Sequence, residues 1–299
     1  MMRSLYSAIS GLKNEQIAMD VIGNNIANVN TVGYKYSRTG FSTMLSQSMR
    51  GASAPDTADP STYGGTDGIQ IGLGSAIGSI DQIMTQGGSQ STGKNTDLML
   101  QGEGFFMLQD SNGNVYLSRN GNFKTDGAGN LVDASTGFIV QGYENDGSDP
   151  WDTLANINLA IGRSDPEGGT NTLSSFEINS QGIIMGTFTD SDSTDGTTDP
   201  AYTVPLYQIA VATCNNPSGL TPVGNNYYQE SPNSGEVKIN VAGENGNRSI
   251  STGCLEMSNV NLSEQFTDMI VTQRGFQANS RVITVSDSML QELVDLKRQ

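Results

Sequence analysis

Residues 258–297 read SNVNLSEQFTDMIVTQRGFQANSRVITVSDSMLQELVDLK and place an apolar side chain at every seventh position. The members of this series are Leu262, Met269, Phe276, Ile283 and Leu290. A strict seven-residue repeat keeps one seam of a helix turned toward a partner helix and implies left-handed supercoiling. The stretch predicts a helix of about 40 residues, roughly 60 Å long. Ser258 or Asn259 is its expected N-cap.

The N-terminal segment carries the same pattern. Residues 3–29 predict a second helix of about 27 residues, roughly 40 Å long. Its seven-residue series is Leu5, Leu12, Met19 and Ile26. An ordinary core helix is the alternative for one amphipathic segment, but matched series at both ends favour coiled-coil packing. We expect a hairpin within one chain or a seam shared by many copies, and the residues of both series are the predicted subunit interface.

Composition argues against catalysis and against nucleic-acid binding. The chain has 299 residues, 35% hydrophobic content, no histidine and a formal net charge of −16. Residues 1–40 carry four basic and two acidic side chains, and residues 255–299 carry four basic and six acidic ones, so the middle alone carries −16. An acidic body repels nucleic acid. The missing histidine removes the commonest general base, so we expect no enzyme.

The first 30 residues are amphipathic and lack the apolar run of a secretory signal, so we expect no cleaved signal peptide. No apolar run reaches the roughly 18 residues of a membrane span, so no membrane insertion is expected. The two cysteines, Cys214 and Cys254, do not make a disulfide framework. A bond between them is possible, and a buried structural thiol is the preferred reading of Cys254.

The middle of the chain predicts β-structure. The apolar runs 105–108 and 115–117 flank residues 110–114, which contain Asn112-Gly113. Asn-Gly between two such runs indicates a hairpin, because type I′ turns need positive φ at both central residues. Further short strands are predicted around residues 123, 131–132, 157–159, 183–185, 206–212 and 236–241.

The predicted fold class is α+β and multi-domain, with long N- and C-terminal coiled-coil-like helices and mostly-β middle domains. Residues 1–33 with 257–299 form the terminal helical domain, and residues 34–70 form an extended arm or linker. Residues 71–145 with 205–256 form a β domain, and residues 146–204 form a small β insertion or outer domain. The arm is polar and aperiodic, so we expect it to be ordered only against neighbours.

Two loops carry weak chemical signals. Residues 72–78 resemble a phosphate-binding glycine loop, but their spacing does not fit G-x-G-x-x-G, and we interpret them as turns or close packing. Residues 190–196 resemble a Ca²⁺ loop without the bidentate glutamate, and we interpret them as a solvated acidic loop. We predict no catalytic, cofactor-binding or metal-binding residue.

Longer motifs at the termini are more specific. Residues 23–35, GNNIANVNTVGYK, resemble the N-terminal signature of the bacterial flagellar axial proteins of rod and hook. Residues 258–262 and 273–281, the latter QRGFQANSR, are similar to the C-terminal segment of hook members, whereas rod members tend to read QRAY there. Residues 86–87, 97, 102–106 and 216–220 also fit the family. The motif residues are Asn24, Asn25, Asn28, Thr31, Gly33, Asn259, Gln273, Arg274 and Asn279.

The resemblance implies a structural role. Hook members of the family polymerise into a short curved tube that links rod to filament and transmits torque as a universal joint. The implied partners are copies of itself, the rod and hook–filament junction proteins, the hook cap and the export apparatus. Subunits would leave through the flagellar type III export channel and assemble in the extracellular hook, with both terminal helices lining the inner tube.

Two alternatives stay open. A distal rod protein would have the same architecture but form a straight, rigid shaft, and residues 273–281 favour hook over rod. A secreted adhesin-like or enzymatic β protein with coiled-coil ends is the second alternative. The missing histidine, and the lack of a carboxylate pair in an apolar setting, count against an enzyme.

Overall fold

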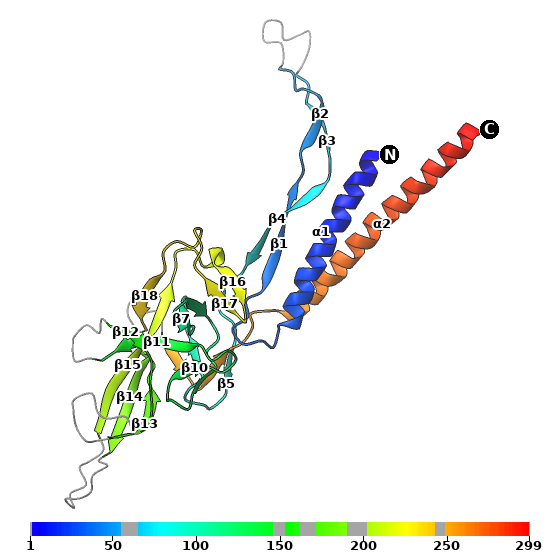
Figure 1. Cartoon of the computed structure of the whole chain (residues 1–299). Helices are drawn as coiled ribbons and strands as arrows, with labels where there is room; N and C mark the ends of the chain where they lie inside the picture. Colours follow the sequence, from blue (N-terminus) through cyan, green and yellow to red (C-terminus); the bar gives the residue numbers. More distant parts are fainter. Residues whose placement is uncertain are drawn as a thin grey trace, which may run out of the picture. The chain divides into compact units, whose positions relative to one another are not determined.

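The computed structural model describes residues 2–54, 65–145, 153–161, 172–189, 202–242 and 249–298. The chain divides into two compact units (Figure 1). The first, which we call the helical unit, comprises Met1–Ala27, Ser37–Gln82 and Asn261–Gln299. The second, which we call the β unit, comprises Asn28–Tyr36 and Ile83–Val260. The terminal helices and the mostly-β middle confirm the predicted α+β class.

Two long helices, α1 (Met2–Ala27) and α2 (Leu262–Arg298), pack side by side in the helical unit (Figure 1). Both predicted helices are confirmed, although α2 begins later than residue 258. Asn261, rather than Ser258 or Asn259, caps α2. Its Oδ1 accepts the Ser263 N–H at 3.1 Å, and its carbonyl oxygen accepts the Gln265 N–H at 3.0 Å.

The rest of the helical unit is two antiparallel ribbons. β1 (Ser37–Thr43) pairs with β4 (Ser75–Gln82), and β2 (Ser46–Arg50) pairs with β3 (Ile69–Gly72). Both β1 and β4 contact α1, where the Asn14 Nδ2 donates to the Ser75 Oγ at 2.8 Å. Residues 37–50 of the predicted arm are thus extended strands paired with residues 69–82. Gly74, in the predicted glycine loop, has φ +127° and lies against Ser10 of α1, so this loop is a turn in close packing.

Within the described ranges, the β unit contains sixteen strands, named in chain order. They are β5 (Ser89–Ser91), β6 (Leu98–Leu100), β7 (Phe105–Gln109), β8 (Val115–Ser118), β9 (Phe123–Thr125), β10 (Leu131–Asp133), β11 (Ile139–Glu144), β12 (Leu154–Asn156), β13 (Thr172–Ile178), β14 (Ile183–Thr189), β15 (Tyr202–Thr213), β16 (Thr221–Gly224), β17 (Tyr227–Gln229), β18 (Lys238–Val241), β19 (Ile250–Thr252) and β20 (Cys254–Glu256). A 3₁₀ turn, Pro217–Gly219, precedes β16.

One sheet organises most of these strands, in the order β13-β14-β15-β11-β7-β8-β17-β16. Off this path, β10 pairs with β9 and β11, β12 with β11, and β18 with β15. The pairs β19–β6 and β20–β5 stand apart from it. All the pairings are antiparallel, and several of them, such as β7–β8 and β13–β14, join consecutive strands as hairpins.

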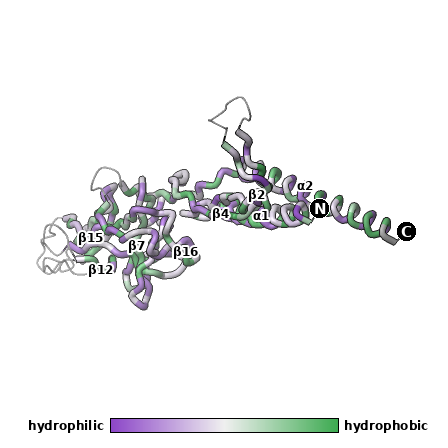
Figure 2. Tube along the Cα trace, turned by 90° about the horizontal axis from the view of Figure 1, so that it is seen from above, coloured by the Kyte–Doolittle hydropathy of each residue, from purple (hydrophilic) through white to green (hydrophobic). Residues whose placement is uncertain are grey.

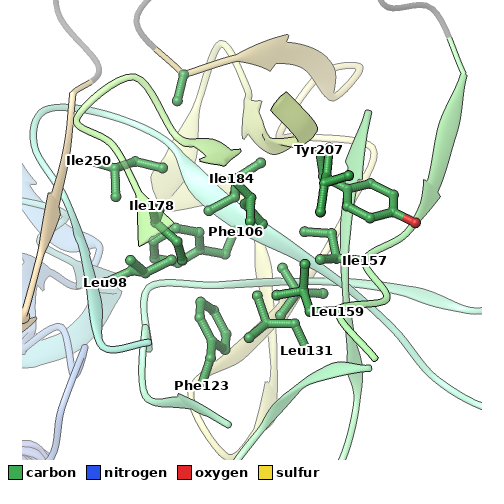
Figure 3. Packing of buried hydrophobic residues seen from close by; sticks show 14 of the residues in the cluster. Leu98, Phe106, Phe123, Leu131, Ile157, Leu159, Ile178, Ile184, Tyr207 and Ile250 are labelled. Atoms are coloured by element: carbon green, nitrogen blue, oxygen red, sulfur yellow. The ribbon is translucent and has the colours of Figure 1, made fainter. Parts of the chain in front are cut away.

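Central strands of the sheet are buried on both faces. Successive side chains point to opposite sides of a strand, so one strand can contribute to an apolar core on each side. In β7, Phe106 and Leu108 join the larger apolar core, and Phe105 and Met107 join a smaller one. In β15, Ile209 and Val211 join the larger core, and Ala210 and Ala212 join the smaller one. Figure 3 shows the larger core, in which Phe106 and Phe123 pack edge to face with ring centroids 5.2 Å apart.

The predicted hairpin at residues 105–117 is confirmed as β7–β8, but its turn type was wrong. Only Gly113, with φ +85°, has positive φ, and its N–H donates to the Asp110 carbonyl oxygen at 2.9 Å. This geometry fits a type I turn followed by a left-handed glycine. Positive φ at successive residues occurs instead at Gly224, Asn225 and Asn226, where β16 turns into β17. The predicted pair at residues 123–132 is confirmed as β9–β10.

Segment 146–204 is described only in part. β13 and β14 form a hairpin that continues the main sheet through β15. No strand lies at residues 157–159; Ile157 and Leu159 are nevertheless buried in the larger core. The predicted acidic loop at residues 190–196 lies outside the described residues.

Cys214 and Cys254 are free and half-buried. In the described ranges, no helix has the length and apolar character needed to cross a bilayer. The same ranges contain no cluster of three or more His, Cys, Asp or Glu residues able to hold a metal ion.

Candidate functional site

α1 and α2 run antiparallel in a defined register. Asn25 faces Gln265, with the Asn25 Nδ2 donating to the Gln265 Oε1 at 2.9 Å. Ten residues earlier on α1, Glu15 faces Gly275, where an added Cβ would lie 2.6 Å from the Glu15 Oε1. Gly11 faces Asn279 in the same way. Moving toward the N-terminus of α1 by a given number of residues therefore corresponds to moving toward the C-terminus of α2 by the same number.

Asn25 ties this hairpin to the ribbon that follows it. Its side chain donates to the Ser37 carbonyl oxygen at 2.8 Å and accepts the Ser37 N–H at 3.0 Å. With only 1% of its surface exposed, Asn25 satisfies its polar atoms within the helical unit. This motif residue sets both the hairpin register and the start of β1.

The seam of α2 alternates polar and apolar residues. From Leu262 to Leu296, every residue of α2 that is buried or half-buried, except Gly275, lies on one series with spacings of four and three. This series is Gln265, Met269, Thr272, Phe276, Asn279, Ile283, Ser286 and Leu290. Such spacing is that of coiled-coil a and d positions. The predicted apolar series thus supplies only half of the seam within one chain.

The predicted interface residues fall into two groups. Leu262 is exposed, and the other eight are half-buried: Leu5, Leu12, Met19, Ile26, Met269, Phe276, Ile283 and Leu290. Packing within the hairpin accounts for part of their burial. Their assignment to contacts between copies stays a prediction.

A second set of apolar side chains is exposed on the same helices. Figure 2 shows apolar residues along both helices, and α2 continues past the N-terminus of α1. The exposed large apolar residues are Met2, Tyr6 and Ile9 of α1, and Leu262, Phe266, Ile270, Val271, Val282, Val285, Met289, Leu293, Val294 and Leu296 of α2. So many exposed large apolar side chains on two helices indicate an interaction site. Leu262 belongs to the predicted series, and sequence periodicity does not show which of the other apolar side chains stay exposed.

In the β unit, the segment after α1 is fixed by motif residues. The Thr31 Oγ1 donates to the Asn28 Oδ1 at 3.1 Å, which closes a turn. Gly33 has φ +69°, and its N–H donates to the Glu256 carbonyl oxygen at 2.8 Å. A Cβ at Gly33 would lie 2.8 Å from the backbone of Arg119, so only glycine fits.

Asn259 fixes the segment before α2. Its Oδ1 accepts the Tyr36 N–H at 2.9 Å, and its Nδ2 donates to the carbonyl oxygens of Ile83 at 2.8 Å and Thr85 at 3.2 Å. One side chain therefore joins three stretches of the β unit that are far apart in sequence.

A buried ionic cluster lies beside this clasp, and sequence reasoning missed it. The Lys35 Nζ lies 2.7 Å from the Glu256 Oε1, and the Arg119 Nη1 lies 3.3 Å from the Glu256 Oε2. None of the three side chains is more than 3% exposed. The available signal was a charged residue at each terminal motif, since Lys35 ends the first motif and Glu256 lies two residues before the second.

Burial lowers the pKa of the Lys35 ammonium, and the adjacent Glu256 carboxylate opposes that shift. Burial likewise lowers the pKa of the Arg119 guanidinium, again opposed by Glu256. The Arg119 guanidinium also lies 5.4 Å from the centroid of the Phe105 ring. One carboxylate thus compensates two buried cations.

The remaining motif residues lie on the helices. Asn24 is exposed near the end of α1. Gln273 and Arg274 are exposed on α2, and the Arg274 Nη1 donates to the Gln277 Oε1 at 3.1 Å. These polar residues interrupt the exposed apolar surface of α2 between Val271 and Val282.

Three family profiles match the chain. Residues 5–35 match the family described as "Flagella basal body rod protein". Residues 99–186 match "Flagellar hook protein FlgE/F/G D1 domain". Residues 251–296 match "Flagellar basal body rod FlgEFG protein C-terminal". The first and third profiles cover the two terminal motifs, and the second begins in β6.

Curated relatives span the whole chain. The flagellar basal-body rod protein FlgG of Bacillus subtilis is 44% identical over 303 residues, covering 100% of both chains. The flagellar hook protein FlgE of Borreliella burgdorferi is 32% identical over 447 residues, covering 99% of this chain and 100% of the relative. The rod protein FlgG of the same organism is 34% identical over 299 residues, covering 100% of both chains.

Proposed function

This chain belongs to the family of bacterial flagellar rod and hook proteins, and we propose that it is the hook subunit of that family. Proteins of this family are structural components of the flagellum and not enzymes. As a hook subunit, the chain polymerises into a curved tube outside the cell that joins rod to filament and transmits torque. It reaches the growing tip through the flagellar export channel.

The exposed apolar surface of α1 and α2 is the observation that carries polymerisation. A side chain such as Phe266 or Ile270 contributes about 1.5–3 kcal/mol when fully buried, and in one chain these residues are largely exposed. Neighbouring copies that cover this surface bring the α2 helices together in a common inner layer. The acidic β units of neighbouring copies meet through wet contacts that slide as the tube bends.

Two observations favour hook over rod. Residues 273–281 carry the hook-like sequence at the centre of α2. Within Borreliella burgdorferi, 32% identity over 447 positions corresponds to more identical residues than 34% over 299 positions, so this chain shares more residues with that hook protein than with that rod protein.

A rod subunit is the second candidate. The Bacillus subtilis relative is named a rod protein and matches the chain end to end. The alignment with the Borreliella hook protein extends over 447 positions, well beyond the 299 residues here, so that relative carries additional segments. A rod subunit would build a straight shaft in the basal body.

Electron microscopy of the polymerised protein separates the candidates. Purified full-length chain is concentrated until it polymerises, and the curvature of the tubes is measured. Curved tubes support the hook subunit, and uniformly straight ones support the rod subunit. A chain that stays monomeric at every concentration contradicts both.

A further inference from the structure

The buried ionic cluster of Lys35, Arg119 and Glu256, which we call the root cluster, joins five stretches of the β unit. Beyond the two ion pairs, the Lys35 Nζ donates to the Thr85 carbonyl oxygen at 2.8 Å. The Gly87 N–H donates to the Glu256 Oε1 at 2.9 Å. The Arg119 Nη2 donates to the Gly102 carbonyl oxygen at 2.7 Å. Each charge is thus also fixed by the backbone.

Uncharged hydrogen bonds, from the backbone and from the Asn259 side chain, also join the segments around Lys35, Thr85 and Glu256. The Ile83 N–H donates to the Tyr36 carbonyl oxygen at 3.0 Å, and the Met257 N–H donates to the Gly88 carbonyl oxygen at 2.8 Å. Residues 28–36 and 253–260 therefore lie next to each other and next to residues 83–88. All of these partners belong to the β unit, so none of the bonds requires α1 or α2 to be formed.

Of the two segments joined by the root cluster, residues 28–36 follow the end of α1 and residues 253–260 precede the start of α2. Lys35 and Glu256 are 221 residues apart in the chain. Closing so long a loop costs conformational entropy, and the β unit has already met that cost when it folds. A buried ion pair also specifies one arrangement, because a displaced partner leaves a buried charge uncompensated.

We propose that the root cluster is a preformed anchor that holds residues 28–36 and 253–260 together. The C-terminal end of α1 and the N-terminal end of α2 are then held at fixed, adjacent points before the two helices pair. With both starting points set, the antiparallel register at Asn25 and Gln265 is reached without a search over alternatives. The anchor does not depend on the proposed function. Only the predicted effect of the anchor on polymerisation rests on that proposed function.

Hydrogen exchange with mass spectrometry of the full chain, kept below its polymerising concentration, tests the anchor. Lys35→Met is the informative variant, because it leaves the neutral one-to-one pair of Arg119 and Glu256. We expect exchange in residues 28–36 to rise at least tenfold, with residues 253–260 and strands β7 and β8 within twofold of wild type. Glu177→Gln, which changes an exposed carboxylate in β13, is the charge control and should alter neither segment.

Glu256→Gln should release both segments at once, because both cations lose their counter-charge. Unchanged exchange at residues 28–36 in Lys35→Met overturns the proposal. A uniform rise across the β unit also overturns it, since the cluster would then be a general core element. The time course of polymerisation is the second readout, and Lys35→Met should lengthen its lag. If wild-type protein never polymerises, the proposed function fails while the exchange result still decides the anchor.

Discussion

Removing exposed apolar side chains from α2 should weaken polymerisation without unfolding the subunit. Ile270, Val285 and Leu293 expose 59%, 55% and 49% of their surface in the single chain. Because full burial is worth about 1.5–3 kcal/mol per side chain, each has about 1 kcal/mol left to gain when a neighbour covers it. Replacing all three with alanine therefore removes about 3 kcal/mol per subunit.

This loss of free energy per subunit determines how far the critical concentration for polymerisation rises. With a factor of ten for every 1.4 kcal/mol, the critical concentration for polymerisation should rise about a hundredfold. Sedimentation of the polymer at a series of total concentrations measures it. Alanine has a higher helix propensity than isoleucine, valine or leucine, so a weaker helix cannot explain the loss.

Ser280→Ala is the matched control, since it changes an exposed polar residue of the same helix. It should leave the critical concentration unchanged, and neither variant should shift the thermal unfolding of the β unit. A triple variant that polymerises within twofold of the wild-type critical concentration would refute the assignment of this surface to contacts between copies.

Three further predictions concern single sites. Asn25→Ala should leave Gln265 without its buried partner and cost the hairpin about 1–3 kcal/mol, seen as a higher critical concentration; an unchanged value would contradict the register argument. Gly33→Ala should destabilise the β unit by more than about 2 kcal/mol. Gly113→Ala, where a Cβ meets open space, should cost only about 1 kcal/mol. Equal melting temperatures for the two variants would contradict this prediction. Burial raises the pKa of Tyr228 to about 12, so this tyrosine ionises at lower pH in the unfolded chain than in the folded one. Its contribution to the free energy of unfolding is therefore complete below pH 10 and should fall as the pH rises toward 12. Urea unfolding from pH 9 to 11 measures this fall, and Tyr228→Phe should flatten it.

Local patterns predicted the parts of this fold that depend on near neighbours. The seven-residue series predicted both helices, and the apolar runs at residues 105–117 predicted the β7–β8 hairpin. The turn type was wrong because Asn112-Gly113 is compatible with more than one loop, and the hydrogen bonds at Asp110 select a type I turn. The N-cap of α2 was displaced to Asn261 because the Asn259 side chain bonds to distant backbone.

The root cluster could not be predicted from spacing, because its partners come from residues 35, 119 and 256 and meet only after the β unit folds. A lone lysine or arginine in a sequence is ordinarily a surface residue. Only the pairing of two cations with one carboxylate makes their burial tolerable. The resemblance to flagellar axial proteins identified Gly33 and Asn259 but gave neither a structural reason.

The polar half of the α2 seam explains why the hairpin and the polymer need not compete for the same side chains. Thr272, Asn279 and Ser286 alternate with Phe276 and Ile283 on the face toward α1, so apolar side chains supply only half of the α2 seam within one chain. The more fully exposed side chains, such as Ile270 and Val285, lie outside that seam. Cohesion of the polymer can therefore come from a surface that the single chain leaves uncovered. The polar seam residues restrict the helices to one register, as polar groups at such positions do in coiled coils.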